Sequence, residues 1–568
     1  MNDTPRFASI WLFGLYSLLS MAPAQTPLYL PPVITGTEVQ LTIQPGVHEF
    51  FPGIETASAG CNGPVLGPTL ILHRGDFVEF SVTNALADTS TMHWHGFHVA
   101  AVHDGGPHNK IAPGATWSPA FEIMDRAGTY WYHPHLHMMT HLQVSKGISG
   151  MIWVRDETEQ ALALPRTYGV DEFPMVVQTK AFDESGQILA DSHQDATAMV
   201  NATVNAALEV PAQLLRFHVL NGASERAFNL GLEGNLAFYL IGTEGGLVST
   251  PIPLTRLRLS PGERAELVVD ASAFAGDTLR WMSFASEFPN GIYGATNPGM
   301  GMGMTLDGYA PNALNGSDFE LLTLVVGPAT EDAVFTLPEI LDPANENPWN
   351  SADADITRVI TMTPQSMGMN ALNGNFLLNG TPFDMATVNY SIPLGNVEIW
   401  NLVNNSPIGH PFHIHDVQFH IIDRNGADPA PEEQGRKDVV FVPAMSSARI
   451  MAAFEDFADA ERPYMYHCHM LTHEDGGMMG QFVVMPATGL EESVANSGAL
   501  PFPVPADAHV VLHHAGGPWR VWDLQGRVIA KRNDAAQQIQ LNTVDWMNGT
   551  YFFQSQGDHA VQRFLIQH

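Results

Sequence analysis

The chain has 568 residues, of which 45% are hydrophobic, and a formal net charge of −34. At about 150 residues per domain, this length predicts three or four domains with substantial cores, and the composition argues against global disorder. The negative charge argues against nucleic acid and anionic membrane surfaces as partners, because the phosphates of both would be repelled.

Residues 1–24 are typical of a secretory signal peptide. Arg6 precedes an apolar run from Phe7 to Leu19, and Ala22-Pro23-Ala24 supplies the small residues of a cleavage site. A membrane anchor is the alternative, but the run is short and no second apolar run follows it. We therefore expect export, with a mature chain that begins near Gln25.

The sequence that follows has the pattern of short β-strands. Val78, Phe80 and Val82 alternate with polar residues, which is the period of a half-buried strand. Similar stretches end at Asn221 and Asn404, and frequent Gly and Pro residues separate the predicted strands. We predict an all-β fold with three Greek-key β-sandwich domains, at residues 25–165, 166–335 and 345–487.

A histidine pattern occurs in the first and third of these domains and is missing from the second. In the outer domains a His-x-His pair begins nine residues after Asn84 and Asn404, whereas Leu230 occupies that position after Asn221. A further His-x-His pair follows in each outer domain. The four pairs are His93/His95, His133/His135, His413/His415 and His467/His469.

These pairs predict a metal site. Alternate residues of a strand point to the same side, so each pair presents two imidazoles together. Eight imidazoles are enough for several metal ions and too many for one. A single pair on a surface means little, but four pairs in matched positions indicate a site built from the first and third domains, with the second as a spacer.

A second metal environment is predicted next to the first. Cys468 lies between two of the histidines and points to the opposite face of its strand; His473 follows five residues later and Met478 five after that. His410 stands three residues before His413. Two imidazoles, a thiolate and a weak thioether are the ligands of a blue-copper electron-transfer site, whereas zinc would have little use for a methionine.

The chain has one other cysteine, Cys61. If Cys468 binds metal as a thiolate, the two cannot form a disulfide. We therefore expect an exported protein without disulfides, in which Cys61 is a buried free thiol.

With these motifs, residues 30–487 resemble the three-domain multicopper oxidases, a family that includes bacterial laccases, cuprous oxidases and bilirubin oxidases. The resemblance implies three cupredoxin-like domains and four copper ions. It assigns the type 1 ion to His410, Cys468, His473 and Met478, the type 2 ion to His93 and His413, and the type 3 pair to His95, His133, His135, His415, His467 and His469.

The resemblance also implies how electrons and protons move. Cys468 is joined through the backbone to two ligands of the type 3 pair, and so links the type 1 site to the other three ions. Asp104 matches the family's acid near the type 2 ion, and Glu474 matches a second acid on the type 3 side. The alternatives are a turn residue for Asp104, and a surface carboxylate or an anchor of a ligand histidine for Glu474.

Five more histidines crowd the same motifs without matching a ligand position. We expect them to contact ligand residues, or to lie in loops or on the surface. They are His98, His103, His108, His137 and His141.

The electron donor is less well defined by the sequence. Met300, Met302 and Met304 form a run in a glycine-rich loop, with Met367 and Met369 further on. Soft thioethers suit Cu(I), and cuprous oxidases of this family use methionine-rich segments, although these commonly lie in the third domain rather than the second. The alternative is a flexible loop in which methionine is incidental.

We therefore expect a secreted, laccase-like enzyme that couples one-electron oxidation of phenolic or similar small donors to the reduction of dioxygen to water. A cuprous oxidase in copper tolerance is the alternative. A non-catalytic copper-binding envelope protein is disfavoured because all ten histidines, Cys468 and Met478 are present. A copper nitrite reductase is disfavoured because it lacks the histidines of a type 3 pair within one chain.

The last part of the chain has a different pattern. After a proline-rich linker at residues 488–506, residues 507–568 predict a small β-sandwich, with a strand, a turn and another strand over Val521–Val528. The segment resembles the C-terminal sorting domain of the type IX secretion system of Bacteroidota, which implies export across the outer membrane by that machinery, with cleavage or surface attachment. A small carbohydrate- or protein-binding module is the alternative.

Overall fold

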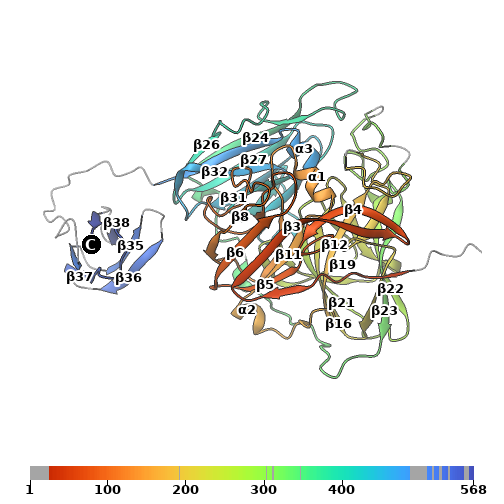
Figure 1. Cartoon of the computed structure of the whole chain (residues 1–568), viewed down its shortest axis with the longest axis horizontal. Helices are drawn as coiled ribbons and strands as arrows, with labels where there is room; N and C mark the ends of the chain where they lie inside the picture. The colour runs from red at the N-terminus through yellow and green to blue at the C-terminus, as the bar shows by residue number, and fades with distance from the viewer. Residues whose placement is uncertain are drawn as a thin grey trace, which may run out of the picture.

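The computed structural model describes residues 25–190, 192–301, 304–309, 312–345, 347–486, 508–513, 517–523, 527–534, 538–555 and 562–568. The expected signal peptide at 1–24 and linker at 488–506 lie outside these residues. Strands hold 48% of the residues and helices 6%, so the prediction of an all-β fold is confirmed (Figure 1). No helix in the described part of the chain is long and apolar enough to cross a membrane.

The first sandwich has two sheets. One has the order β2 (Val33–Thr35), β5 (Thr69–His73), β11 (Gly150–Arg155), β10 (Gly128–His133) and β7 (His93–His95). The other has the order β4 (Ile54–Cys61), β3 (Glu38–Phe51), β6 (Phe77–Asn84) and β8 (Thr116–Trp117), with β9 (Ala120–Glu122) also on β6. In β6 the predicted alternation holds: Val78, Phe80 and Val82 are buried in the core between the sheets.

The third sandwich repeats this plan. One sheet has the order β25 (Phe376–Leu378), β24 (Ile356–Pro364), β27 (Val397–Asn404), β31 (Ser446–Ala453) and β29 (His420–Arg424). The other has the order β26 (Tyr390–Pro393), β33 (Met479–Met485), β32 (Asp459–Cys468), β28 (His410–Ile414) and β30 (Val439–Val442). His413 pairs with His467 across β28 and β32, as His93 pairs with His133 across β7 and β10. The two histidine motifs therefore occupy the same place in the two sandwiches.

The second sandwich lies between them in sequence. One sheet has the order β1 (Thr26–Pro27), β15 (Ala206–Pro211), β23 (Asp318–Gly327), β22 (Thr278–Phe284), β17 (Phe228–Leu232) and β20 (Leu257–Leu259). The other has the order β14 (Thr203–Val204), β13 (Thr197–Val200), β12 (Glu172–Lys180), β16 (Leu214–Asn221), β21 (Arg264–Asp270), β18 (Phe238–Thr243) and β19 (Gly246–Leu254). Leu230 and Leu232, which take the place of a histidine pair, are buried in its apolar core.

The C-terminal strands form a small unit of their own (Figure 1). β34 (His509–His513) pairs with β37 (Gln538–Asn542), and a four-stranded sheet has the order β36 (Val528–Asp534), β35 (Gly517–Asp523), β38 (Gly549–Ser555), β39 (Gln562–Ile566). Val510, Val521, Phe553 and Phe564 share one apolar core.

A buried ionic network joins the first sandwich to the second. The Arg216 guanidinium lies 2.6 Å from Glu159 of α2 (Glu157–Gln160), 2.6 Å from Glu266 and 3.3 Å from Glu172. All four side chains are at most 1% exposed. Arg155 also pairs with Glu159 and Glu172, and His218 with Glu172 and Glu266, but among the described residues Arg216 alone pairs with all three carboxylates.

Replacing Arg216 by methionine is therefore expected to destabilise the protein by about 3–5 kcal/mol, because it removes the one guanidinium that the three buried carboxylates share. Denaturant unfolding measures the change. The matched control is Arg280→Met, which breaks an exposed pair with Glu233 and is expected to cost less than about 1 kcal/mol. Equal losses for the two variants would show that the network does not stabilise the interface.

Candidate metal centre

The four histidine pairs converge on one buried region. They come from β7, β10, β28 and β32 and from the residues just after these strands, and every one of the eight is at most 1% exposed. Their ring nitrogens form three groups in which the ligand atoms lie within 4.8 Å of one another: His93/His95/His413, His95/His133/His469 and His135/His415/His467.

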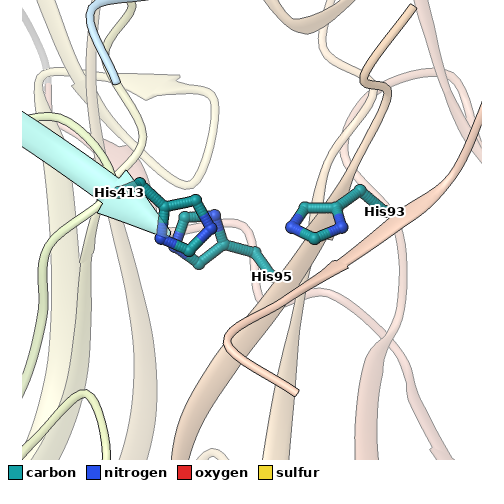
Figure 2. A group of neighbouring side chains, drawn as sticks. All are labelled: His93, His95 and His413. Carbon is teal, nitrogen blue, oxygen red and sulfur yellow. The ribbon is translucent and has the colours of Figure 1, made fainter. Parts of the chain in front are cut away.

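His93 and His413, which are predicted to bind the type 2 ion, lie together in the first of these groups. The Nδ1 of His93 lies 2.9 Å from the backbone oxygen of Asp104, and that of His413 lies 2.8 Å from the backbone oxygen of Asp438. In an imidazole that donates from Nδ1, the Nε2 lone pair is free to bind metal. Both Nε2 atoms are buried and have no hydrogen-bond partner among the described residues. Figure 2 shows His93 across from His413, which stacks on His95 at 3.8 Å.

The other two groups match the residues expected for the type 3 pair. His95 Nδ1 lies 3.4 Å from His133 Nε2 and 3.3 Å from His469 Nε2. In the second group His467 Nε2 lies 3.1 Å from His135 Nε2 and 3.4 Å from His415 Nε2. Nitrogens this close fit three ligands around one ion, whose bonds to imidazole are about 2 Å long.

Five of these imidazoles have a lowered pKa and are neutral. Burial lowers the pKa of His135 and of His469 to about 3. Burial, together with neighbouring histidines, also holds the pKa values of His95, His133 and His413 well below the ordinary value. Neutral imidazoles carry the lone pair that a metal ion needs, so the pocket is prepared for metal rather than for protons.

The expected type 1 ligands also meet. Cys468 Sγ lies 3.6 Å from His410 Nδ1 and 3.8 Å from His473 Nδ1, and the two nitrogens are 3.3 Å apart. Met478 is fully buried, and its backbone bonds to both Cys468 and His473, which holds it beside the set. Burial raises the pKa of the Cys468 thiol, so metal binding has to displace its proton.

The two cysteines are both free and buried, as expected. Cys61 lies in the core of the first sandwich. Burial raises the pKa of its thiol to about 12. It is therefore an inert core residue rather than a nucleophile.

Asp104 and Glu474 contact the ligands directly. Asp104 Oδ2 lies 2.9 Å from His415 Nδ1, and its Oδ1 lies 3.4 Å from His93 Nδ1. Glu474 lies 3.3 Å from His135 Nδ1 and 3.2 Å from His467 Nδ1. Burial disfavours both carboxylates, but the adjacent histidines outweigh it and hold both pKa values well below their usual range. With 2% and 1% exposure, neither is a surface residue.

Comparison with known proteins agrees with this geometry. Two family models, both described as multicopper oxidase, match residues 42–159 and 352–488. The chain is 30% identical over 453 residues to the multicopper oxidase mco of Staphylococcus haemolyticus, covering 78% of this chain and 88% of that protein. The chain belongs to the multicopper oxidase family.

Other relatives of this multicopper oxidase differ in what their names say. The cell division protein FtsP of Escherichia coli is 29% identical over 481 residues, covering 82% of this chain and 94% of that protein. A bacterial laccase-like multi-copper oxidase from Ochrobactrum sp. superposes with a TM-score of 0.70 at 33% identity, over 81% of this chain and 100% of that structure. A metallo-oxidase from Campylobacter jejuni does so with a TM-score of 0.68 at 27% identity, over 82% and 96%.

Copper fits the residues of both sites. A buried thiolate, two imidazoles and a thioether suit a redox-active copper ion, and clustered neutral imidazoles suit copper as well. The unpartnered Nε2 atoms of His93 and His413 are the kind of buried polar atom that a bound ion would satisfy.

Three residues of the centre were not predicted from the sequence. Asp438 lies 3.2 Å from His95 Nε2, and its backbone oxygen accepts from His413. Arg264 of β21, in the second domain, binds both oxygens of this carboxylate at 2.5 and 2.6 Å. Close by, Gly262 has a φ of +82°, and a Cβ there would lie 2.8 Å from the His469 ring. The second domain is therefore more than a spacer, since it contacts the centre through these residues.

The other five histidines do not join a metal-binding group within the described ranges. His98 pairs with Asp416 at 2.9 Å and His108 with Gln481 at 2.9 Å. His137 packs on Phe383, His103 on Phe121, and His141 bonds to the backbone oxygen of Ala190.

The variant Cys468→Ser is expected to lose the intense visible absorption of a copper–thiolate bond and one equivalent of bound copper. Absorption spectroscopy and metal analysis of the purified protein measure both. The control is Cys61→Ser, which removes the other buried thiol and is expected to keep the spectrum. An unaltered spectrum in Cys468→Ser would refute the type 1 assignment.

The variant Arg264→Met is expected to retain copper about 10–100-fold less well against a chelator, because Asp438 then loses the group that holds it against His95 and His413. Copper content after dialysis measures this. Arg256→Met, which breaks a pair with Glu287 in the same domain, is the control and is expected to behave as wild type. The double variant Arg264→Met/Asp438→Asn lacks the unpaired buried charge. It is expected to regain the free energy of unfolding without regaining copper retention. Unchanged retention in Arg264→Met would show that the second domain does not support the centre.

Proposed function

We propose that this protein is a laccase-like oxidase that couples one-electron oxidation of phenolic or similar small donors to the reduction of dioxygen to water, using four copper ions. The observation that carries the proposal is the complete set of ten histidines, Cys468 and Met478, brought together in two neighbouring sites. Copper bound there would supply one-electron redox chemistry and the place where dioxygen is reduced.

The chain supplies a short connection between the two sites. Cys468 is bonded through the backbone to His467 and His469, one from each histidine group of the proposed type 3 pair. Its side chain points to the opposite face of β32, toward His410 and His473. Electrons taken up beside Cys468 therefore have a covalent path to the second site.

Dioxygen also needs four protons to become two molecules of water. Asp104 and Glu474 are the acids proposed to deliver them, and their positions on ligand histidines support this role. The Asp104 carboxylate accepts a hydrogen bond from His415 Nδ1, and Glu474 lies 3.2 Å from His467 Nδ1. They would thereby fix the ring orientations, and as ionised carboxylates they would accept protons in transit and pass them on to the reacting oxygen.

A non-catalytic role in the cell envelope is the competing function, because relatives include proteins named for cell division. Such a role does not require two complete metal sites. The burial of so many unpaired ring nitrogens is costly unless metal binds them, so the intact ligand set favours catalysis.

A cuprous oxidase is the second candidate, and the placement of two methionines favours it. Met300 donates from its backbone to Pro407 at 2.7 Å, and Met445 to Ser406 at 3.3 Å. Both side chains are exposed, at 45% and 65%. They flank the turn that leads into His410, whose ring contacts Ser406 at 2.8 Å. Thioethers at this position suit a Cu(I) donor.

We also propose that the protein acts outside the cell, as a secreted or surface-attached protein of a Bacteroidota-type bacterium. The apolar run from Phe7 to Leu19 supports export. The small β unit at residues 507–568 is proposed to be the sorting domain recognised by the type IX secretion machinery.

Oxygen uptake by the copper-loaded protein tests the function, with 2,6-dimethoxyphenol and Cu(I) as alternative donors. Strong turnover of the phenol is expected. If the exposed thioethers collect copper, the double variant Met300→Leu/Met445→Leu is expected to lower oxygen uptake with Cu(I) but not with the phenol. The control is Met547→Leu, which replaces an exposed methionine of the C-terminal unit and is expected to leave oxygen uptake with both donors unchanged. No oxygen uptake with either donor, despite full copper loading, would overturn the oxidase function.

A further inference from the structure

The indole ring of Trp131 contacts all three histidines of one proposed type 3 group. Its centroid lies 4.1 Å from that of the stacked His133 ring, 5.2 Å from that of His95 and 5.6 Å from that of His469. In the described part of the chain, the histidines of the other group make ring contacts with histidines only. Indole and phenol are the aromatic side chains that lose an electron most readily, so one half of the proposed pair has a redox-active neighbour.

A second tryptophan continues from the first. Across β10 and β11, Trp131 is opposite Met151 and Thr129 is opposite Trp153, so the two indoles lie diagonally on the same face of the sheet. Diagonal neighbours on paired strands are about 7–8 Å apart, within reach of large aromatic side chains. Both tryptophans are buried in one apolar cluster with residues of the second domain.

A tyrosine brings the series of rings to the surface. The ring centroids of Trp153 and Tyr168 are 5.3 Å apart, and Tyr168 is half-buried. Its hydroxyl donates to the backbone oxygen of Pro31 at 2.6 Å and lies 3.3 Å from Thr69 Oγ1. Burial raises the pKa of Tyr168 to about 12, so the hydroxyl carries its proton. Three redox-active rings thus connect the histidine group with solvent.

The protons of these rings determine where an oxidising equivalent would stop. The Nε1 atoms of Trp131 and Trp153 are buried and have no hydrogen-bond partner among the described residues. An indole that loses an electron becomes acidic, but without an acceptor it keeps its proton, and the positive charge stays free to move on. An oxidised phenol is a strong acid, and at the half-buried Tyr168 water can take its proton. The oxidising equivalent would therefore come to rest on Tyr168.

The charges around Trp153 do not oppose this movement. The Arg155 guanidinium lies 5.7 Å from the Trp153 ring centroid, and alone it would disfavour a positive charge there. It pairs with Glu159 at 3.3 Å and with Glu172 at 2.5 Å, which offset its charge. His218 stacks on Trp153 at 3.9 Å and is neutral, because burial lowers its pKa.

We propose that Trp131, Trp153 and Tyr168 form an electron-transfer chain that supplies the oxygen-reducing site with a missing electron when the donor runs out, and so moves the oxidising equivalent to the surface. The inference rests on the proposed oxidase function, because dioxygen is the oxidant. One electron leaves Trp131 for the site, Trp153 replaces it, and Tyr168 replaces the electron of Trp153. Tyr168 loses its hydroxyl proton to water and becomes a neutral tyrosyl radical. A phenolic donor that arrives later returns one electron and one proton to Tyr168.

Electron paramagnetic resonance tests the chain. The copper-loaded full chain is reduced with one electron fewer per molecule than dioxygen needs, mixed with dioxygen without donor, and frozen at once. Wild type is expected to show a tyrosyl radical, identified by the change in its spectrum when the tyrosine rings are deuterated. Tyr168→Phe and Trp153→Phe are expected to lose this signal. The control is Tyr239→Phe, which replaces a half-buried tyrosine of β18 in the second domain and is expected to keep it.

Peptide mass spectrometry tests the consequence for the metal centre. During turnover with scarce donor, Tyr168→Phe and Trp153→Phe are expected to accumulate oxidised ligand histidines and to lose copper faster than wild type for the same amount of dioxygen consumed. With donor in excess, both variants are expected to take up oxygen as wild type does. Wild-type copper content and visible spectrum show that a variant has folded. Tyr168→Phe removes only a hydroxyl, so its result decides if Trp153→Phe does not fold.

The outcomes separate the two proposals. If wild type takes up oxygen but the starved sample shows no tyrosyl radical, or if Tyr168→Phe keeps the signal unchanged, the chain is overturned and the oxidase function stands. Equal damage to wild type and Tyr168→Phe also counts against the chain. If the fully copper-loaded protein takes up oxygen with no donor at all, the oxidase function fails, and the chain fails with it because it has no oxidant.

Discussion

The fold is organised around the burial of neutral imidazoles whose lone pairs point at one another. Desolvation keeps His95, His133 and His413 unprotonated, and buried nitrogens without partners are destabilising until something binds them. Neither outer sandwich alone can enclose this cluster, because each contributes only two of the four strands that carry it. The metal centre and the contact between the first and third domains therefore depend on each other. Bound ions would stabilise that contact as well as react there.

Buried carboxylates beside the ligand histidines supply negative charge without occupying the positions that would bind metal. Asp104 and Glu474 each contact two ligand histidines at the atom that faces away from the metal groups. Asp438 does the same for His95, and its charge is balanced by Arg264 from the second domain. Negative charge next to the cluster would compensate the positive charge of the ions. When no ion is bound, the Arg264 guanidinium offsets part of that negative charge. The second domain thus helps to set the charge of a centre to which it contributes no ligand.

The sequence predicted the features that depend only on the spacing of residues along one strand. A His-x-His pair in a strand has a fixed geometry, so spacing alone predicts that the two rings of His413/His415 point the same way, as do those of His467/His469. Asp438 follows no such spacing, because its role depends on a strand pairing and on a guanidinium 174 residues away. Gly262 was equally hidden, since its close approach to His469 depends on how two domains pack. Alternation along strands predicts cores and pairs, but not which residues of separate domains meet.

The positions around the type 1 ligands also constrain how two kinds of donor could be used. The exposed thioethers of Met300 and Met445 flank the turn at Ser406 and Pro407, which leads to the fully buried His410. His473 is instead the proposed type 1 ligand with an exposed edge. Electron transfer weakens steeply with distance, so a donor at the methionines would have to act through the turn, whereas a donor at the exposed edge of His473 would be next to a proposed ligand. The proposed organic donors would therefore reach the site at His473, whereas the proposed Cu(I) oxidation would depend on a separate surface of the same site.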